Sequence, residues 1–255
     1  MTINDDFGGV IHIIDGSFEG LLTSVFTAHA EKRFPSGVYA RDAYQQSIYE
    51  TPVLIATDLT KAERVKNGIL RKLGSHIYEN AWTAYLSCDP ERFGKISKFL
   101  RLAFIVGRAV SDMMTETEVL DIMSICRNVG RETNKLSGFL RFSVMENGVQ
   151  FAEITPEHNQ IPLLMQHFAD RLGEIPFVIY DSRRKIAGIY DAKEWYVTEA
   201  EGLKLPDLAA DEELVRSLWR KFYKTIAVEA RVNPKLQRNL MPKRYWRNMT
   251  EHIQP

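Results

Sequence analysis

Hydrophobic and polar positions at the start of the chain predict a strand, a turn and a helix. Residues 10–14 (VIHII) form a short β-branched run that is typical of a strand. Residues 15–17 (DGS) have turn chemistry, and Ser17 is placed to cap a helix. From Phe18 onward, apolar residues recur at helical spacing. A second strand is predicted over residues 51–55, and we expect it to pair in parallel with the first.

The chain between the second strand and residue 135 is predicted to be helical. This helical stretch begins at Asp58 or Thr60. Apolar residues at helical spacing predict helices that include residues 69–73, 76–86, 96–106 and 119–129.

After residue 135 the pattern changes to an alternation of apolar and polar residues, which predicts strands. Residues 139–145 alternate in this way, and residues 149–154 are the expected partner strand. Between them lies Asn147-Gly148, which tolerates the positive φ angles of a tight hairpin turn. We expect Gly138 to supply a special backbone conformation where helix gives way to strand.

The same region continues with a helix and further strands. A short helix is predicted over residues 161–172, with Pro162 in its first turn. Strands are predicted over 175–180 and 185–190, and residues 195–197 extend the sheet. The order β-β-α-β-β implies an antiparallel sheet with a helix across one face.

The last part of the chain is predicted to be helical. Leu214, Leu218, Phe222 and Ile226 form one apolar stripe, and Asn233-Pro234 breaks that helix before a last one that runs to about Met249. The predicted fold class is α+β. It combines an N-terminal α/β part (1–135), a central antiparallel β-β-α-β-β sheet (136–200) and a basic helical C-terminal cap (201–255), either as three parts or as one compact unit.

Composition places the chain among ordinary globular proteins. It has 255 residues, of which 45% are hydrophobic and 26% charged, and no apolar run approaches the ~18–20 residues of a membrane helix. The acidic start MTINDDFGG does not resemble a signal peptide. Only Cys88 and Cys126 are present, so neither a disulfide framework nor a cysteine-rich metal or iron–sulfur site is available. We therefore expect a cytoplasmic protein that does not interact with membranes.

Charge is balanced overall but unevenly distributed. Lys plus Arg and Asp plus Glu both number 33. Residues 1–31 contain five acidic residues and no Lys or Arg, whereas residues 216–247 contain ten basic residues against Glu229 alone, a local net charge of +9. This asymmetry indicates a basic surface for nucleic acid or phosphate, a merely solvated basic helix, or an internal clasp between the two ends of the chain.

A polar cluster in the predicted sheet region carries the best candidate for chemistry. No Walker loop and no GxGxxG, GxSxG, HExxH or CxxC motif is present, so the common chemistries that use them are unsupported. His167, Asp170 and Arg171 share one face of the predicted short helix. The residues that flank this helix in sequence are Glu153, Glu157, His158, Asp181, Arg183 and Arg184.

This cluster allows three interpretations. Its residues could serve general acid–base catalysis, with His158, His167, Glu153 and Asp181 as candidates. A metal could be held by His158, His167 and a carboxylate. In the third and simplest interpretation, Arg171 pairs with a neighbouring acid and His167 packs on an aromatic ring. We expect no metal and no cofactor.

Two segments are candidates for nucleic-acid contact. A strand face with Phe139, Arg141 and Ser143 could stack on and clamp a base, or it could support packing of the C-terminal helices. In residues 233–246, basic residues are interleaved with Tyr245 and Trp246, a pattern suited to phosphate contact and base stacking, although such aromatics also fit a core.

Four segments resemble a known bacterial family: residues 14–22 (IDGSFEGLL), 138–142 (GFLRF), 177–187 (FVIYDSRRKIA) and 233–246 (NPKLQRNLMPKRYW). The family is a DNA-metabolism or DNA-repair family of unknown mechanism. It is encoded beside a radical-SAM DNA-modification protein and in some bacteria is fused to a uracil-DNA-glycosylase-like domain. The resemblance runs from residue 14 to about residue 250 and implies a role in DNA repair with a partner that carries radical chemistry. This chain lacks the cysteine cluster which that chemistry requires, and no catalytic residues carry over.

The leading functional hypothesis is an accessory protein of DNA repair that binds DNA and docks a radical-SAM partner. The alternative is an enzyme that acts on a DNA base or nucleotide through the His158, His167, Glu153 and Asp181 pocket. The predicted DNA-binding residues are Arg141, Arg183, Arg184, Lys185, Lys235, Arg238, Lys243, Arg244, Tyr245 and Trp246.

Overall fold

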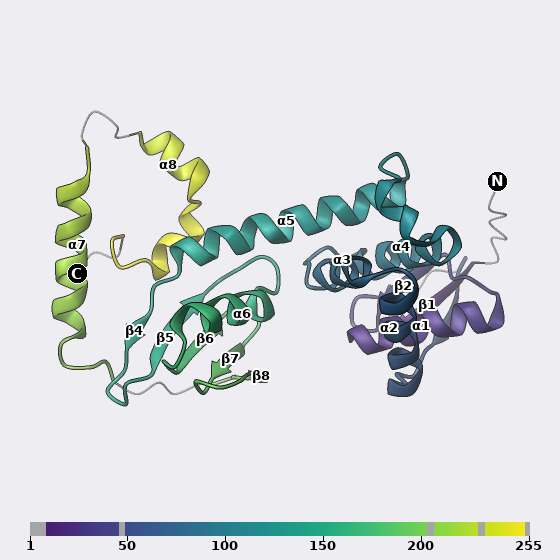
Figure 1. Cartoon of the computed structure of the whole chain (residues 1–255), viewed down its shortest axis with the longest axis horizontal. Coiled ribbons are helices and arrows are strands. Elements are labelled where there is room, and N and C mark those ends of the chain that lie inside the picture. Colours follow the sequence, from purple (N-terminus) through teal and green to yellow (C-terminus); the bar gives the residue numbers. More distant parts are fainter. Residues whose placement is uncertain (1–8, 46–48, 203–206, 229–232, 253–255) are drawn as a thin grey trace. The chain divides into compact units, whose positions relative to one another are not determined.

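The computed structural model describes residues 9–45, 49–202, 207–228 and 233–252. The chain divides into two compact units, Met1–Val129 and Gly130–Pro255, and each combines helices with a sheet (Figure 1). The α+β class predicted from the sequence is therefore confirmed. The parts expected at 136–200 and 201–255 both fall within the second unit.

The first unit contains a three-stranded parallel sheet in the order β2-β1-β3. Its central strand β1 (Val10–Ile14) is buried at every position, and it lies between β2 (Gly37–Ala40) and β3 (Thr51–Leu54). The two predicted strands and their parallel pairing are confirmed. The sequence did not reveal β2, since four residues (GVYA) are too few to show a period.

Helices cover this sheet and begin where the sequence predicts caps. The hydroxyl of Ser17 accepts a hydrogen bond from the Gly20 amide (2.9 Å) at the start of α1 (Phe18–Glu31). Asp58 accepts from two amides at the start of α2 (Leu59–Lys72). The helical elements that follow are α3 (Ser75–Tyr85), α4 (Arg92–Val106), η1 (Gly107–Asp112) and α5 (Thr117–Phe139).

Helix α5 extends beyond its predicted end and replaces part of a predicted strand. It runs to Phe139, so Gly138 is helical and has no positive φ angle. Strand β4 is reduced to Ser143–Val144. The alternation over 139–145 was misleading because Phe139, Leu140 and Phe142 all pack on one hydrophobic cluster from a helix end and a loop. The strand predicted over 139–145 is therefore confirmed only at Ser143–Val144, which pairs antiparallel with β5, and the special role of Gly138 is wrong.

The second unit contains a five-stranded sheet in the order β4-β5-β6-β7-β8. Strands β5 (Gln150–Ile154) and β6 (Phe177–Asp181) are parallel, so the sheet is mixed rather than antiparallel as predicted. The cause is α6 (Ile161–Leu172), since a helical crossover returns the chain to the end at which the first strand began. The other pairs, which involve β7 (Ile186–Tyr190) and β8 (Trp195–Glu199), are antiparallel. The predicted Asn147-Gly148 turn is confirmed, with Gly148 at φ 79°.

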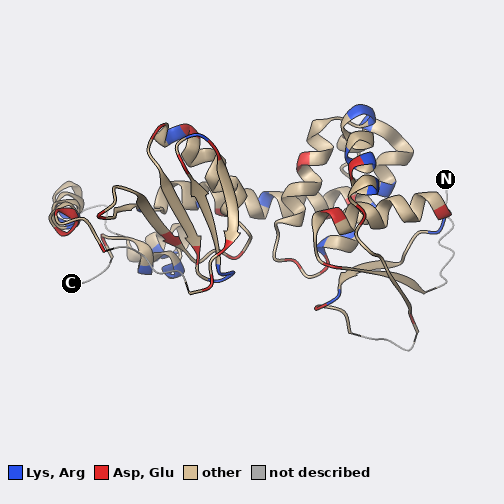
Figure 2. Cartoon of the chain, turned by 90° about the horizontal axis from the view of Figure 1, so that it is seen from below, with Lys and Arg blue, Asp and Glu red and all other residues tan. Residues whose placement is uncertain are grey.

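The C-terminal segment is helical but interrupted. It comprises α7 (Glu212–Ile226), α8 (Pro234–Leu240) and the 3₁₀ helix η3 (Lys243–Asn248). The single helix predicted from residue 234 to 249 is wrong because Pro242 cannot continue a helix. Figure 2 shows Lys and Arg positions along these C-terminal helices. Within the described part of the chain, no helix combines the length and apolar character needed to cross a bilayer.

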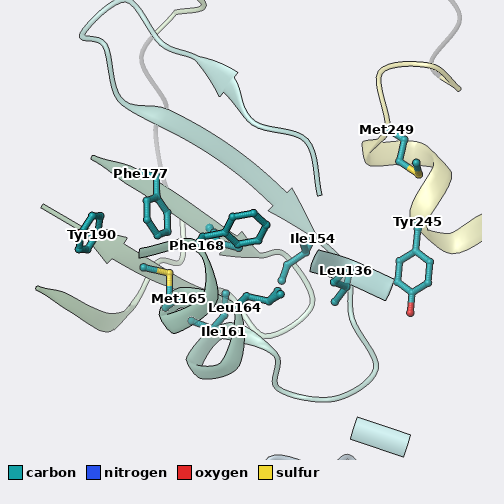
Figure 3. Close-up of a cluster of buried hydrophobic side chains, with 11 residues drawn as sticks. Leu136, Ile154, Ile161, Leu164, Met165, Phe168, Phe177, Tyr190, Tyr245 and Met249 are labelled. Atoms are coloured by element: carbon teal, nitrogen blue, oxygen red, sulfur yellow. The ribbon is translucent and has the colours of Figure 1, made fainter. Parts of the chain in front are cut away.

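A single hydrophobic cluster joins the sheet, α6 and the C-terminal segment of the second unit (Figure 3). Helix α6 lies close to β7, and a Cβ atom at Gly188 would clash with Met165 and Ile161. At the other end of the cluster, Tyr245 and Met249 contribute buried side chains. The C-terminal segment therefore belongs to the core of this unit, and this packing positions the candidate site.

Candidate functional site

The four predicted acid–base residues do not share one pocket. In the β5–β6 register Glu153 pairs with Tyr180 and Ile154 pairs with Asp181, so alternation places Glu153 and Asp181 on opposite faces of the sheet. His167 is exposed on α6. Its ring packs edge-on against that of Phe168, with the ring centroids 4.9 Å apart. The simplest interpretation of His167, packing on an aromatic ring, is confirmed.

Asp181 has a structural rather than a catalytic position. Its side chain is fully buried and accepts hydrogen bonds from the amides of Arg183 (2.9 Å) and Arg184 (3.1 Å). The guanidinium of Arg184 donates to the second oxygen at 2.9 Å. These bonds hold the turn between β6 and β7, in which Lys185 has a positive φ of 58°. Asp181 is therefore a turn-forming residue.

The predicted ligands do not come together as a metal site in the described residues. Across the residues that the structure describes, no group of three His, Cys, Asp or Glu side chains could hold a metal ion. His158 and His167, the two predicted ligands, are both described.

A different carboxylate, which the sequence did not single out, organises the second unit. Glu132 of α5 is 4% exposed and accepts hydrogen bonds from the amides of Glu157 (2.9 Å) and His158 (2.8 Å). The hydroxyl of Tyr245 donates to it at 2.8 Å, and the guanidinium of Arg244 donates at 3.4 Å. We call these five residues the Glu132 cluster. It fastens three segments together: α5, the loop after β5, and η3.

The electrostatics of the Glu132 cluster favour an ionised Glu132 carboxylate. Burial alone would raise the pKa of Glu132, but hydrogen bonds from the Glu157 and His158 amides and from Tyr245 outweigh it and hold the pKa below its usual value. Burial lowers the pKa of His158, although Glu132 and Glu157 act in the opposite direction. Burial also raises the pKa of Tyr245 to about 12.

A sequence signal for Glu132 existed. Val129, Glu132 and Leu136 lie three and four residues apart, so they share one face of α5, and both apolar residues are buried. A lone carboxylate on a buried helical face must find partners, because an unpaired buried charge is costly. The partners themselves lie far away in sequence and could not be read from α5.

Arg141 connects the loop after α5 to the C-terminal segment. It lies in the loop after α5, and its guanidinium binds Glu251 at 2.7 Å while stacking over Trp219 at 5.4 Å. Phe139 packs on Tyr245, with ring centroids 5.9 Å apart. Of the two roles predicted for this segment, support for the C-terminal helices is therefore confirmed.

The two C-terminal aromatic residues that were predicted to stack on bases contact other parts of the protein instead. Tyr245 is 4% exposed, so its ring presents no face for base stacking, and that prediction is wrong. Trp246 is half-buried and stacks on His252 with ring centroids 4.5 Å apart. Its indole N–H donates to the carbonyl of Met241 at 2.9 Å.

A family model for a domain of unknown function, DUF4130, matches residues 90–251. The match covers more than half of the chain. This chain belongs to the DUF4130 family. No curated protein matches the chain. The DUF4130 match includes the Glu132 cluster and the C-terminal segment.

Other predicted basic residues of the DUF4130 region are exposed and form no ion pair with a carboxylate in the described residues. Within the described ranges, none of the following five forms an ion pair: Arg183, Lys185, Lys235, Arg238 and Lys243. We call these five residues the exposed cations.

The two basic segments of the DUF4130 region meet at the loop after β5. From the β6–β7 turn, Arg184 donates to the Glu157 carbonyl. From η3, Arg244 pairs with the Glu157 carboxylate. The turn and η3 therefore flank one loop, although they are about sixty residues apart in sequence.

The C-terminal charges are clasped within their own unit. Arg247 pairs with Glu153 at 3.4 Å, Arg244 with Glu132 and Glu157, and Arg141 with Glu251. The hypothesis of a clasp with the acidic N-terminus rested partly on Asp5 and Asp6, which lie outside the described residues. In the part of the chain that the structure describes, these arginines pair with glutamates of the second unit.

Proposed function

We propose that this protein is a DNA-binding accessory protein of DNA repair or DNA metabolism. It contacts the phosphate backbone through the exposed cations of its DUF4130 region. The observation that carries the proposal is the division of the predicted basic residues into two groups. Arg141, Arg184 and Arg244 are paired with carboxylates, whereas the exposed cations keep their full charge at the surface.

The physical argument rests on where uncompensated charge remains. A phosphate binds a Lys or Arg whose charge is not already neutralised by a neighbouring carboxylate. Because the whole chain has no net charge, attraction to DNA must come from a local surface rather than from the overall field. The paired arginines then act indirectly, since they fix the turn and η3 that carry Arg183, Lys185 and Lys243.

The resemblance noted above supports the cellular part of the proposal. It implies a bacterial DNA-repair protein that works beside a radical-SAM partner, and this chain supplies no cysteine cluster of its own. We therefore assign DNA contact to this protein and the chemistry to the partner.

Fluorescence anisotropy with single-stranded and duplex DNA across a salt series tests the proposal. The test variant is the triple substitution Lys235→Gln, Arg238→Gln, Lys243→Gln. Each lost phosphate contact lowers the salt slope of duplex binding by about 0.9, so three contacts lower it by roughly 2.7. If ~6–10 phosphates are contacted, wild-type affinity falls ~10³–10⁵-fold between about 50 and 200 mM salt.

A matched control removes the same charge elsewhere. Arg33→Gln, Arg71→Gln, Lys72→Gln changes three exposed cations of the first unit that form no ion pair within the described ranges. This control should bind DNA like the wild type. Equal loss of binding in both triple variants would show that DNA binding depends on net charge and not on these particular residues, and would contradict the proposal. A folded wild type that binds no DNA would reject the proposal.

A further inference from the structure

Helix α7 presents an apolar face that nothing in the described structure covers. Leu214, Val215, Leu218, Phe222 and Ile226 are each more than half exposed. Among the described residues, nine of the 22 exposed large hydrophobic side chains lie between residues 214 and 240. Apolar exposure is therefore concentrated at one place, and such a patch marks an interaction site.

The contacts that hold α7 in the second unit come from another face of the helix. Glu212 accepts from the Val144 amide, and Arg216 donates to the Ser143 hydroxyl. One turn further on, Trp219 donates to Glu251 at 3.0 Å. At 3.6 residues per turn, Leu214 and Leu218 lie opposite these three residues. The rest of the stripe, namely Val215, Phe222 and Ile226, lies on the side of the helix between Leu218 and Trp219. The exposed stripe is thus left over after α7 has docked.

The outer flank of the stripe carries opposite charges at its two ends. Glu213, Ser217, Lys221 and Lys224 follow at i, i+4, i+8 and i+11, so they form one row along about 16 Å of helix. Glu213 is 68% exposed and pairs with Arg220 of its own helix. Lys221 and Lys224 are exposed and form no ion pair in the described residues.

We propose that the α7 stripe docks against the α7 stripe of a second copy of this chain, in antiparallel orientation. A two-fold axis places the same patch on both sides of the interface. Antiparallel pairing brings the acidic end of one flank beside the basic end of the other, so that Glu213 of each copy meets Lys224 of its partner copy. It also opposes the two helix dipoles favourably. Parallel pairing about a two-fold axis would place the two charged rows on opposite sides of the interface, so Glu213 and Lys224 of the two copies would not meet.

Sedimentation velocity of the full chain over a range of concentrations tests this proposal. Wild type should be dimeric, and Leu218→Asp should weaken the dimer by at least about 30-fold, as expected for a central apolar anchor. Because Leu218 is exposed, the variant monomer should keep the wild-type fold, which circular dichroism checks. The matched control is Leu240→Asp on α8, an equally exposed leucine outside the stripe, which should leave the dimer intact.

Charge reversal tests the orientation. Glu213→Lys and Lys224→Glu should each weaken the dimer by about 10-fold, since the two-fold axis doubles every contact. Their combination should restore dimerisation, because the exchanged charges are again complementary. Failure of the combined variant to recover would exclude the antiparallel arrangement.

Three results would overturn the proposal. The first is a wild type that stays monomeric. The second is a monomer that floats with phosphatidylserine vesicles unless Leu218 is changed to Asp, which would assign the stripe to an anionic lipid surface. The third is a monomer destabilised by Leu218→Asp, which would show that the stripe packs on its own chain. None of these results bears on the DNA proposal, which uses other residues.

Discussion

The two units of this protein use ion pairs in different ways. In the described residues of the first unit, the pairs are local in sequence: Lys61–Asp58, Lys66–Glu63, Lys95–Asp89 and Lys95–Glu91. In the second unit local pairs also occur, but others join distant segments. Arg141 and Glu251 are 110 residues apart, and Arg244 and Glu132 are 112 apart.

This difference follows from the contacts that hold the segments of each unit together. The first unit surrounds a fully buried strand, β1, with helices, so apolar packing and hydrogen bonds between neutral and polar groups, rather than long-range ion pairs, bring its described segments together. The second unit must hold a C-terminal segment that lies far in sequence from α5 and β5. Buried carboxylates such as Glu132 anchor this segment, and breaking such pairs is costly. A basic residue in the sequence is therefore not by itself a nucleic-acid contact.

The largest expected effect comes from Glu132. Glu132→Ala leaves the buried amides of Glu157 and His158 without an acceptor, and we expect a loss of about 3 kcal/mol in the free energy of unfolding. Urea unfolding followed by circular dichroism measures it. The control is Asp170→Ala, an exposed carboxylate of the same unit that accepts a hydrogen bond from Gln166. Equal stability of the two variants would contradict the anchoring role of Glu132.

A smaller effect is expected for the pair between Arg141 and Glu251. The Glu251 side chain is buried while Arg141 is partly exposed, so we expect a coupling energy of about 2 kcal/mol in a double-mutant cycle with Arg141→Ala and Glu251→Ala. Arg141→Lys keeps the charge but loses the two-pronged contact, and should recover only part of this energy. A coupling energy near zero would place Arg141 among residues that are free to bind a ligand.

Acid should weaken the second unit in two steps. The folded-state pKa of His158 is lowered, so the unfolded chain takes up a proton first, and stability falls as pH drops below 6.5. The pKa of Glu132 is also lowered, so its contribution is fully present above 4.5 and is lost as pH falls through the lower folded value.

Thermal unfolding between about pH 7 and pH 2 checks these steps. His12, His29 and His252 also have pKa values lowered by burial, so the wild type alone does not isolate His158. His158→Gln should flatten the first step, and Glu132→Gln the second. If either variant keeps the wild-type pH profile, the corresponding residue does not cause that step.

The smallest effect is expected for a local pair of the first unit. Lys66 and Glu63 are both well exposed, and we expect Lys66→Ala to change the free energy of unfolding by less than about 0.5 kcal/mol. The same urea measurement applies. A loss as large as that of Glu132→Ala would erase the contrast between the units.

Local patterns in the sequence were sufficient for most elements of the fold. Helix α6 begins and ends at the predicted residues 161 and 172, and Ser17 and Asp58 cap helices as expected. These features depend on neighbours within a few positions, so a single sequence contains them. Most of the strand predicted over 139–145 failed to form because tertiary packing, not local alternation, places those aromatic side chains.

The sequence by itself determined where the charges lie, including the basic C-terminal stretch and the apolar stripe of α7. Only the tertiary structure decided which of these charges are paired with an opposite charge. Glu132 and Glu251 select their arginines across about 110 residues, and β5 and β6 become parallel through the crossover of α6. Helical and strand periods report contacts a few residues away, whereas the pairing of buried charges depends on segments that only folding brings together.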